Sequence, residues 1–291
     1  MVLSEDVQRA AFEGDLETIT AWMASNDVND TVVATPHRFN ANSRSTLLKL
    51  IVKRATKAGA SQVSVLPLAR AVIARGADLE LSNSGCPPLH LAAESRGYES
   101  VAMCSLLIEA GADVNQKAYE SKTPLGVALD SLRVTPEELK LGSSASSLTR
   151  TTLEVVCVLL RAGASLDGVN GTRWSAEQVL DLHLKNSNRS WNRQRLSYAI
   201  RLSDDENVHA ILYLLHGVRA AGSWRGFLNT RYYQPLARLR GLASRGHATT
   251  EDRMLALLFA LPHRPFRVVL SYWRVLPSWF FSPRSIRGAN N

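Results

Sequence analysis

A short motif of Gly, Ala and a polar residue recurs along this 291-residue chain and constrains its fold more than any other feature. Gly76, Gly111 and Gly163 each open one copy, and they lie 35 and 52 residues apart. A run of Leu, Ile, Val and Ala at helical spacing precedes every copy. Glycine enters the left-handed backbone region without strain, so each of these glycines is predicted to end a helix. The chain is therefore predicted to contain repeated helical units.

A second motif stands where the next helix is expected to begin. The chain reads Pro-Pro-Leu-His over residues 87–90 and Thr-Pro-Leu-Gly over residues 123–126. Proline is favoured at the first helical position, because its missing N–H would find no partner there in any case. The residues that define the two motifs are Gly76, Pro88, Leu89, His90, Gly111, Thr123, Pro124 and Gly163.

These motifs resemble the ankyrin repeat, most closely over residues 85–115. The resemblance implies an all-α fold, an ankyrin-repeat solenoid of about five imperfect helix-turn-helix repeats with a helical C-terminal cap. In a solenoid each unit packs against its neighbours and shares a core with them. The ankyrin domain is expected over residues 1–222, with repeats near residues 5–30, 44–80, 85–115, 121–167 and 172–222.

The fourth repeat is predicted to differ from the third in two ways. A Ser- and Leu-rich insertion over residues 132–147 accounts for the 52-residue spacing. Gly126 stands where the third repeat has His90, so a hydrogen bond is lost and we expect this repeat to be looser. The apolar residues expected in the shared core include Leu89, Leu91, Ala92, Leu106, Leu107, Leu125, Val127, Leu159 and Leu160.

Charge divides the chain into two unlike parts. Residues 1–170 contain 16 Lys and Arg against 19 Asp and Glu, a net charge of −3. Residues 171–291 contain 18 against 7, a net charge of +11. We expect a basic helical cap over residues 223–277 and a flexible tail over residues 278–291, because the tail is rich in Pro, Ser, Gly and Asn.

The resemblance implies that the chain binds a protein partner of unknown identity through its loop tips and inner helix face. Tyr119 and Arg173 stand out at those tips, because aromatic and arginine side chains dominate the energetics of protein interfaces. The residues that we expect to contact the partner are Asn83, Ser84, Tyr119, Glu120, Lys122, Asn170, Thr172 and Arg173.

The chain offers little for catalysis. It contains no P-loop, nucleophile-elbow or His-Glu-x-x-His motif. Its three cysteines are too far apart for a zinc knuckle, and their small, odd number fits a reducing compartment. His90 matches the motif histidine, whose role in the family is structural. We therefore expect an intracellular protein, in cytoplasm or nucleus, that is not an enzyme and has no metal or cofactor.

The C-terminal region allows an alternative function. Leu261-Pro262, followed by Leu270, Tyr272 and Trp273, resembles an F-box and the Leu-Pro end of a SOCS box. Such boxes recruit a ubiquitin-ligase core, so the resemblance implies a ligase subunit as a partner and a substrate-receptor role for the repeats. His263 and Arg264 depart from the F-box pattern, which has acidic residues after Leu-Pro.

A second alternative is nucleic-acid binding by the Arg-rich C-terminal segment, in which Trp and Tyr are interspersed. Arginine contacts phosphates and aromatic rings stack on bases. No known nucleic-acid fold is recognisable, so a nucleic-acid partner is not favoured. The most apolar stretch, residues 254–281, is interrupted by charged residues, and no membrane-spanning helix is expected.

Overall fold

The computed structural model describes residues 5–29, 31–33, 44–56, 63–81, 86–94, 97, 99–118, 121–132, 145–171, 174–188, 205–245 and 260–262. The chain forms two compact units, residues 1–216 and 217–291.

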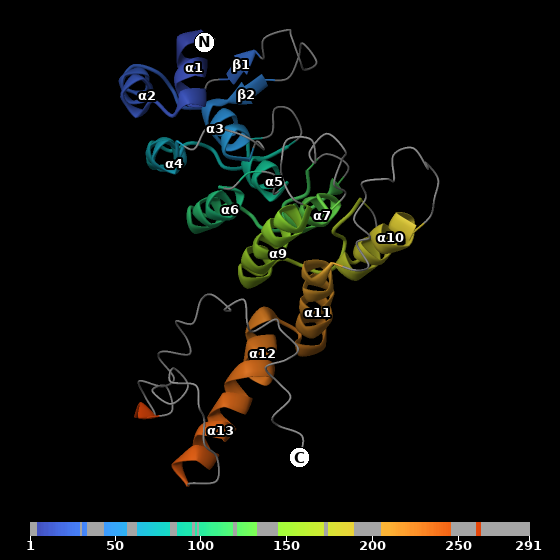
Figure 1. Cartoon of the computed structure of the whole chain (residues 1–291). Coiled ribbons are helices and arrows are strands. Elements are labelled where there is room, and N and C mark those ends of the chain that lie inside the picture. The colour runs from blue at the N-terminus through green and yellow to red at the C-terminus, as the bar shows by residue number, and fades with distance from the viewer. Residues whose placement is uncertain are drawn as a thin grey trace. The chain divides into compact units, whose positions relative to one another are not determined.

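The first unit consists of successive helix pairs, which Figure 1 shows one behind another from α1 to α10. The pairs are α1 (Glu5–Glu13) with α2 (Leu16–Met23), α3 (Leu47–Thr56) with α4 (Leu66–Ala74), α5 (Pro88–Ala93) with α6 (Ser100–Glu109), and α7 (Pro124–Asp130) with α9 (Ala145–Arg161). Helix α10 (Ala176–Asn188) packs against α7, and α11 (Glu206–Ala221) follows it in the chain.

Two short strands interrupt this helical pattern. Strands β1 (Thr31–Val33) and β2 (Arg44–Thr46) form an antiparallel pair in which Val32 lies opposite Ser45. They lie between the first two helix pairs. All other regular elements of the described residues are helices, which confirms the mostly helical solenoid.

The three motif glycines adopt the left-handed conformation that the sequence predicts. Their φ angles are +86° at Gly76, +101° at Gly111 and +94° at Gly163. At Gly111 the chain closes the helix end with two hydrogen bonds, from the Gly111 N–H to the Ile108 carbonyl and from the Ala112 N–H to the Leu107 carbonyl, both 3.0 Å. Each glycine thus ends the second helix of its repeat.

Helix α9 begins earlier than expected, because residues 145–147 belong to it and not to an irregular insertion. Leu148 and Thr152 lie one turn apart on the same face, and only 6% and 2% of their surfaces are exposed. The Thr152 hydroxyl also donates to the Leu148 carbonyl at 3.1 Å. Burial of this face extends the helix beyond the clearly apolar run.

The shared core contains nearly all the residues that the sequence places there. Helix α5, whose six residues are all buried, packs against α3, α6 and α7. Val127 is the exception, because it is half-buried on α7 and not part of the core. The expected core residues that are buried are Leu89, Leu91, Ala92, Leu106, Leu107, Leu125, Leu159 and Leu160.

Polar side chains at the helix ends tie each repeat to the next one. The Asn29 amide accepts from the Asp78 N–H at 2.7 Å and donates to the Gly76 carbonyl at 3.2 Å. Asn115 forms the same pair of bonds two repeats later, with the Ser165 N–H at 2.7 Å and the Gly163 carbonyl at 3.3 Å. Asn29 and Asn115 therefore satisfy backbone groups at Gly76–Asp78 and Gly163–Ser165, which the helix ends leave without helical partners.

In the second unit a nearly continuous helical rod follows Gly222, whose φ is +70°. Ser223 caps α12 (Trp224–Leu228), then come a π-helical turn, η4 (Asn229–Tyr233), and α13 (Gln234–Ser244). Pro235 explains the wide turn, because a proline lacks the N–H of the regular ladder and its ring clashes with the carbonyl four residues earlier. The helices expected after residue 250 lie almost entirely outside the described residues.

Candidate protein-binding surface

His90 connects the third repeat to the loop that opens the fourth. Its side chain is fully buried at the start of α5, and its Nε2 lies 3.0 Å from the Lys122 carbonyl oxygen. A carbonyl only accepts, so Nε2 carries the proton. Burial lowers the pKa of His90 below 6.5, although hydrogen bonding to the backbone of Lys122 and Gln116 partly offsets that effect. The side chain of His90 thus contacts the backbone of the loop that opens the fourth repeat.

Gly126 occupies the equivalent position in the fourth repeat, and the next loop lies close to it although the histidine hydrogen bond is absent. A Cβ atom on Gly126 would lie 2.0 Å from the Val169 carbonyl oxygen. The same carbonyl accepts from the Thr123 N–H at 3.1 Å. The missing side chain lets the backbone of the next loop approach α7 directly, so this contact is close.

Two loops lie side by side at one edge of the first unit. The chain turns at Ser121, which has a left-handed φ of 54°, and the Ser121 carbonyl accepts from the Gly171 N–H at 3.2 Å. In the second loop Asn170 pairs with Trp174 in an isolated β-bridge. We call the residues Ser121, Lys122, Asn170, Gly171 and Trp174 the loop surface. Backbone hydrogen bonds join the described residues of the two loops to each other and within each loop.

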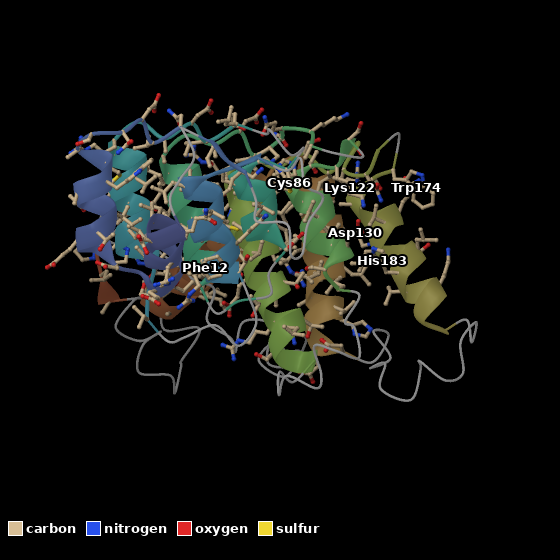
Figure 2. The ribbon with its side chains drawn as sticks, turned by 90° about the horizontal axis from the view of Figure 1, so that it is seen from above. Phe12, Cys86, Lys122, Asp130, Trp174 and His183 are labelled. Carbon is tan, nitrogen blue, oxygen red and sulfur yellow. The ribbon has the colours of Figure 1, made fainter. Side chains whose placement is uncertain are left out.

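An ionic network lies beneath the loop surface and joins the fourth and fifth repeats. The Lys122 ammonium lies 3.0 Å from one oxygen of Asp130, and Nε2 of His183 lies 2.9 Å from the other oxygen. Figure 2 shows Asp130 and His183 side by side, between α7 and α10. Burial raises the pKa of Asp130, but hydrogen bonds from His183 and Lys122 outweigh it, so the pKa lies below 3.8.

Trp174 is a surface residue that the sequence reasoning did not single out for binding. Its side chain is 41% exposed on the loop surface, and Figure 2 places it at the end of the stack. The sequence pattern points to its N-terminal neighbour, Arg173, instead. No apolar period runs through this loop, so periodicity does not distinguish a core position from a surface position for Trp174.

The structure brings together only some of the residues that the sequence predicts for binding. Lys122 and Asn170 both lie on the loop surface and are half-buried. The others lie outside the described residues: Asn83, Ser84, Tyr119, Glu120, Thr172 and Arg173.

Most residues of the segment that resembles an F-box or SOCS box also lie outside the described residues. Leu261 is half-buried, and its carbonyl oxygen accepts a hydrogen bond from the Arg240 guanidinium. Pro262 is exposed. Leu270, Tyr272 and Trp273 lie outside the described residues, so the resemblance to an F-box or SOCS box stays a prediction from the sequence.

The thiols are protonated groups in apolar surroundings. Burial raises the pKa of Cys86 to about 11 and that of Cys104 to about 12. Cys86 precedes α5 and is half-buried. Within the described ranges, no three His, Cys, Asp or Glu side chains come together as a metal site would require. No helix in the described part has the length and hydrophobicity to cross a membrane.

Comparison with known proteins agrees with this architecture. A family model described as "Ankyrin repeat" matches residues 84–119, which include α5 and α6 of the third repeat. Protein fem-1 homolog A from Danio rerio is 30% identical over 110 residues, which cover 34% of this chain. The matched stretch spans only 15% of that curated relative.

The helix pairs, the left-handed glycines and the hydrogen bonds between repeats define a helical repeat protein of the solenoid class. The match to the family model identifies an ankyrin repeat at residues 84–119, within this helical solenoid. Ankyrin repeats generally mediate protein–protein interactions, and proteins of this type are typically not enzymes.

Proposed function

We propose that the first unit is an interaction scaffold that binds a protein partner across the loop surface. One observation carries this proposal: Trp174, 41% exposed, stands on a loop that its own backbone bridge and the neighbouring loop hold in place. A large aromatic ring on a preorganised backbone offers apolar area to a partner at little entropic cost. Tryptophan is also among the residues most enriched in interface hot spots.

The ion pair below the loop surface supplies the polar part of the contact. Lys122 and Asp130 are each about a quarter exposed, so a partner would cover them together with Trp174. The pair is already formed, and its charges would enter an interface partly neutralised. We expect the neighbouring residues predicted from the sequence, above all Tyr119 and Arg173, to extend the same contact.

The test replaces Trp174 with alanine and measures which proteins the full chain retains from a cell extract. Tyr213, 40% exposed on α11, is a matched control as an equally exposed aromatic residue outside the loop surface. A hot-spot residue contributes about 2 kcal/mol, so Trp174→Ala should weaken the partner's affinity by about 30-fold. The Tyr213→Ala variant should retain the partner.

A photo-crosslinking amino acid at position 174 or position 213 then distinguishes direct contact from an indirect effect. Crosslinks to the retained protein from position 174 alone would support the proposal. Both variants should melt like the parent chain. If Trp174→Ala and Tyr213→Ala then retain the same proteins from the extract, the loop surface is not the binding site.

The ubiquitin-ligase adaptor and the intracellular location remain predictions from the sequence. The adaptor hypothesis requires the segment around Leu261 and Trp273, which the repeats do not contain. A pull-down with the full chain and with a chain ending at Ala221 tests it. Ligase subunits should co-purify only with the full chain, and their absence from both would exclude the adaptor role.

A further inference from the structure

The second unit has an extreme charge. Residues 217–245 contain six arginines and no lysine, aspartate or glutamate. This stretch therefore has no acidic side chain of its own to balance the guanidinium groups. A ligand for it has to be anionic.

Apolar packing holds the α12 end of the rod in this unit. Phe227 on α12 is 3% exposed and lies against Gly217 of α11, where an added Cβ would come within 2.3 Å of the phenylalanine ring. Trp224 adds a tilted contact to the same ring at 5.9 Å between centroids. Helix α13, in contrast, has no buried residue. The packing that holds α12 does not extend to α13.

Helix α13 has two distinct faces. Leu236, Leu239 and Leu242 recur every three residues, so at 100° per residue they share an arc of about 120°. Leu239 and Leu242 are 41% and 38% exposed. Arg238 and Arg240 lie about 40° beyond the two ends of that arc. The leucines thus form an apolar stripe, exposed at Leu239 and Leu242 and half-buried at Leu236, that arginines border on both sides.

We propose that α13 is an interfacial helix that binds the surface of an anionic membrane. Leucines on one face would enter the boundary between headgroups and acyl chains, and the bordering arginines would extend to the headgroup phosphates. A nucleic acid offers the phosphates but no apolar phase for three leucines. The stripe therefore favours a lipid surface, and the charge restricts it to an anionic one. This inference concerns the second unit and is independent of the loop surface.

Vesicle co-sedimentation of the full chain tests the proposal. The chain should sediment with vesicles of phosphatidylcholine and phosphatidylserine but not with phosphatidylcholine alone. A surface arginine contributes roughly five-fold to such binding, so Arg238→Gln with Arg245→Gln should weaken it about 25-fold. Replacement of Leu239 and Leu242 by glutamine should abolish it. The matched control is the exposed pair Arg70→Gln with Arg75→Gln in the second repeat, which should bind as the parent chain does.

Three outcomes would overturn the proposal. Equal binding to both vesicle types would show that the arginines do not contribute to binding. Undiminished binding of the double glutamine variant at Leu239 and Leu242 would show that the leucines do not contribute. Retention of a single-stranded DNA oligonucleotide through Arg238 and Arg245, without vesicle binding, would assign the helix to nucleic acid. Because α13 buries no side chain, all these variants should keep the thermal unfolding of the parent chain.

Discussion

The third and fourth repeats connect to the next repeat in two different ways at the same motif position. In the third, His90 spans the gap with its imidazole and contacts the Lys122 carbonyl at 3.0 Å. In the fourth, Gly126 has no side chain, and the Val169 carbonyl fills the space itself. The distance between a helix and the following loop therefore depends on the residue at this position. With glycine at this position, the backbone of the following loop contacts the helix directly.

The largest expected effect comes from a substitution that moves the fourth repeat toward the ankyrin pattern. Gly126→His should destabilise the chain by about 3 kcal/mol, because any Cβ there meets the Val169 carbonyl oxygen at 2.0 Å. Gly126→Ala should lower the free energy of unfolding by about 2 kcal/mol, because the gain in helix propensity, at most about 1 kcal/mol, offsets only part of the same clash. Urea unfolding followed by circular dichroism measures both.

Gly241 in α13 offers the matched control for these glycine variants. A Cβ on Gly241 would have the Arg245 guanidinium, at 3.7 Å, as its nearest neighbour. Gly241→Ala should leave unfolding of the repeats unchanged. If Gly126→Ala also leaves the urea midpoint unchanged, the close contact between α7 and the second loop does not exist.

A smaller loss is expected in the third repeat when its side-chain contact is removed. His90→Ala should cost about 2 kcal/mol, because the variant loses a buried ring and its hydrogen bond to Lys122. The Lys122 carbonyl keeps a second donor, the Ala118 N–H at 2.9 Å, which limits the loss. A urea midpoint equal to that of the parent chain would show that His90 does not connect the two repeats.

The smallest effect is the dependence of stability on pH that His90 gives the third repeat near neutral pH. Burial lowers the pKa of His90 below 6.5, so protonation favours the unfolded chain. The contribution of His90 is complete above pH 6.5 and is lost as the pH falls through the folded-state pKa. The loss is at most about 1.4 kcal/mol per pH unit. The free energy of unfolding should therefore change less between pH 7.5 and pH 5.5 in His90→Ala than in the parent chain. An equal change in both chains would contradict the assignment to His90.

Local sequence rules predict the repeat framework well, because local chemistry produces it. Gly76, Gly111 and Gly163 end helices where the backbone turns left-handed, and α4 runs from Leu66 to Ala74 as its apolar run predicts. The binding surface is harder to predict. Trp174 is exposed because its loop pairs with itself at Asn170, and no periodicity in the sequence reports that pairing.

The amino-acid sequence is sufficient for the class of this protein, since an ankyrin repeat is a local pattern of helix starts, helix ends and apolar spacing. The contacts between repeats depend on the folded backbone. Whether Gly126 weakens or tightens its repeat follows from where the Val169 carbonyl lies, and Asp130 meets His183 although they are 53 residues apart in the chain. The number of residues between two segments does not indicate how far apart they lie in space. Packing of the helices brings these segments together.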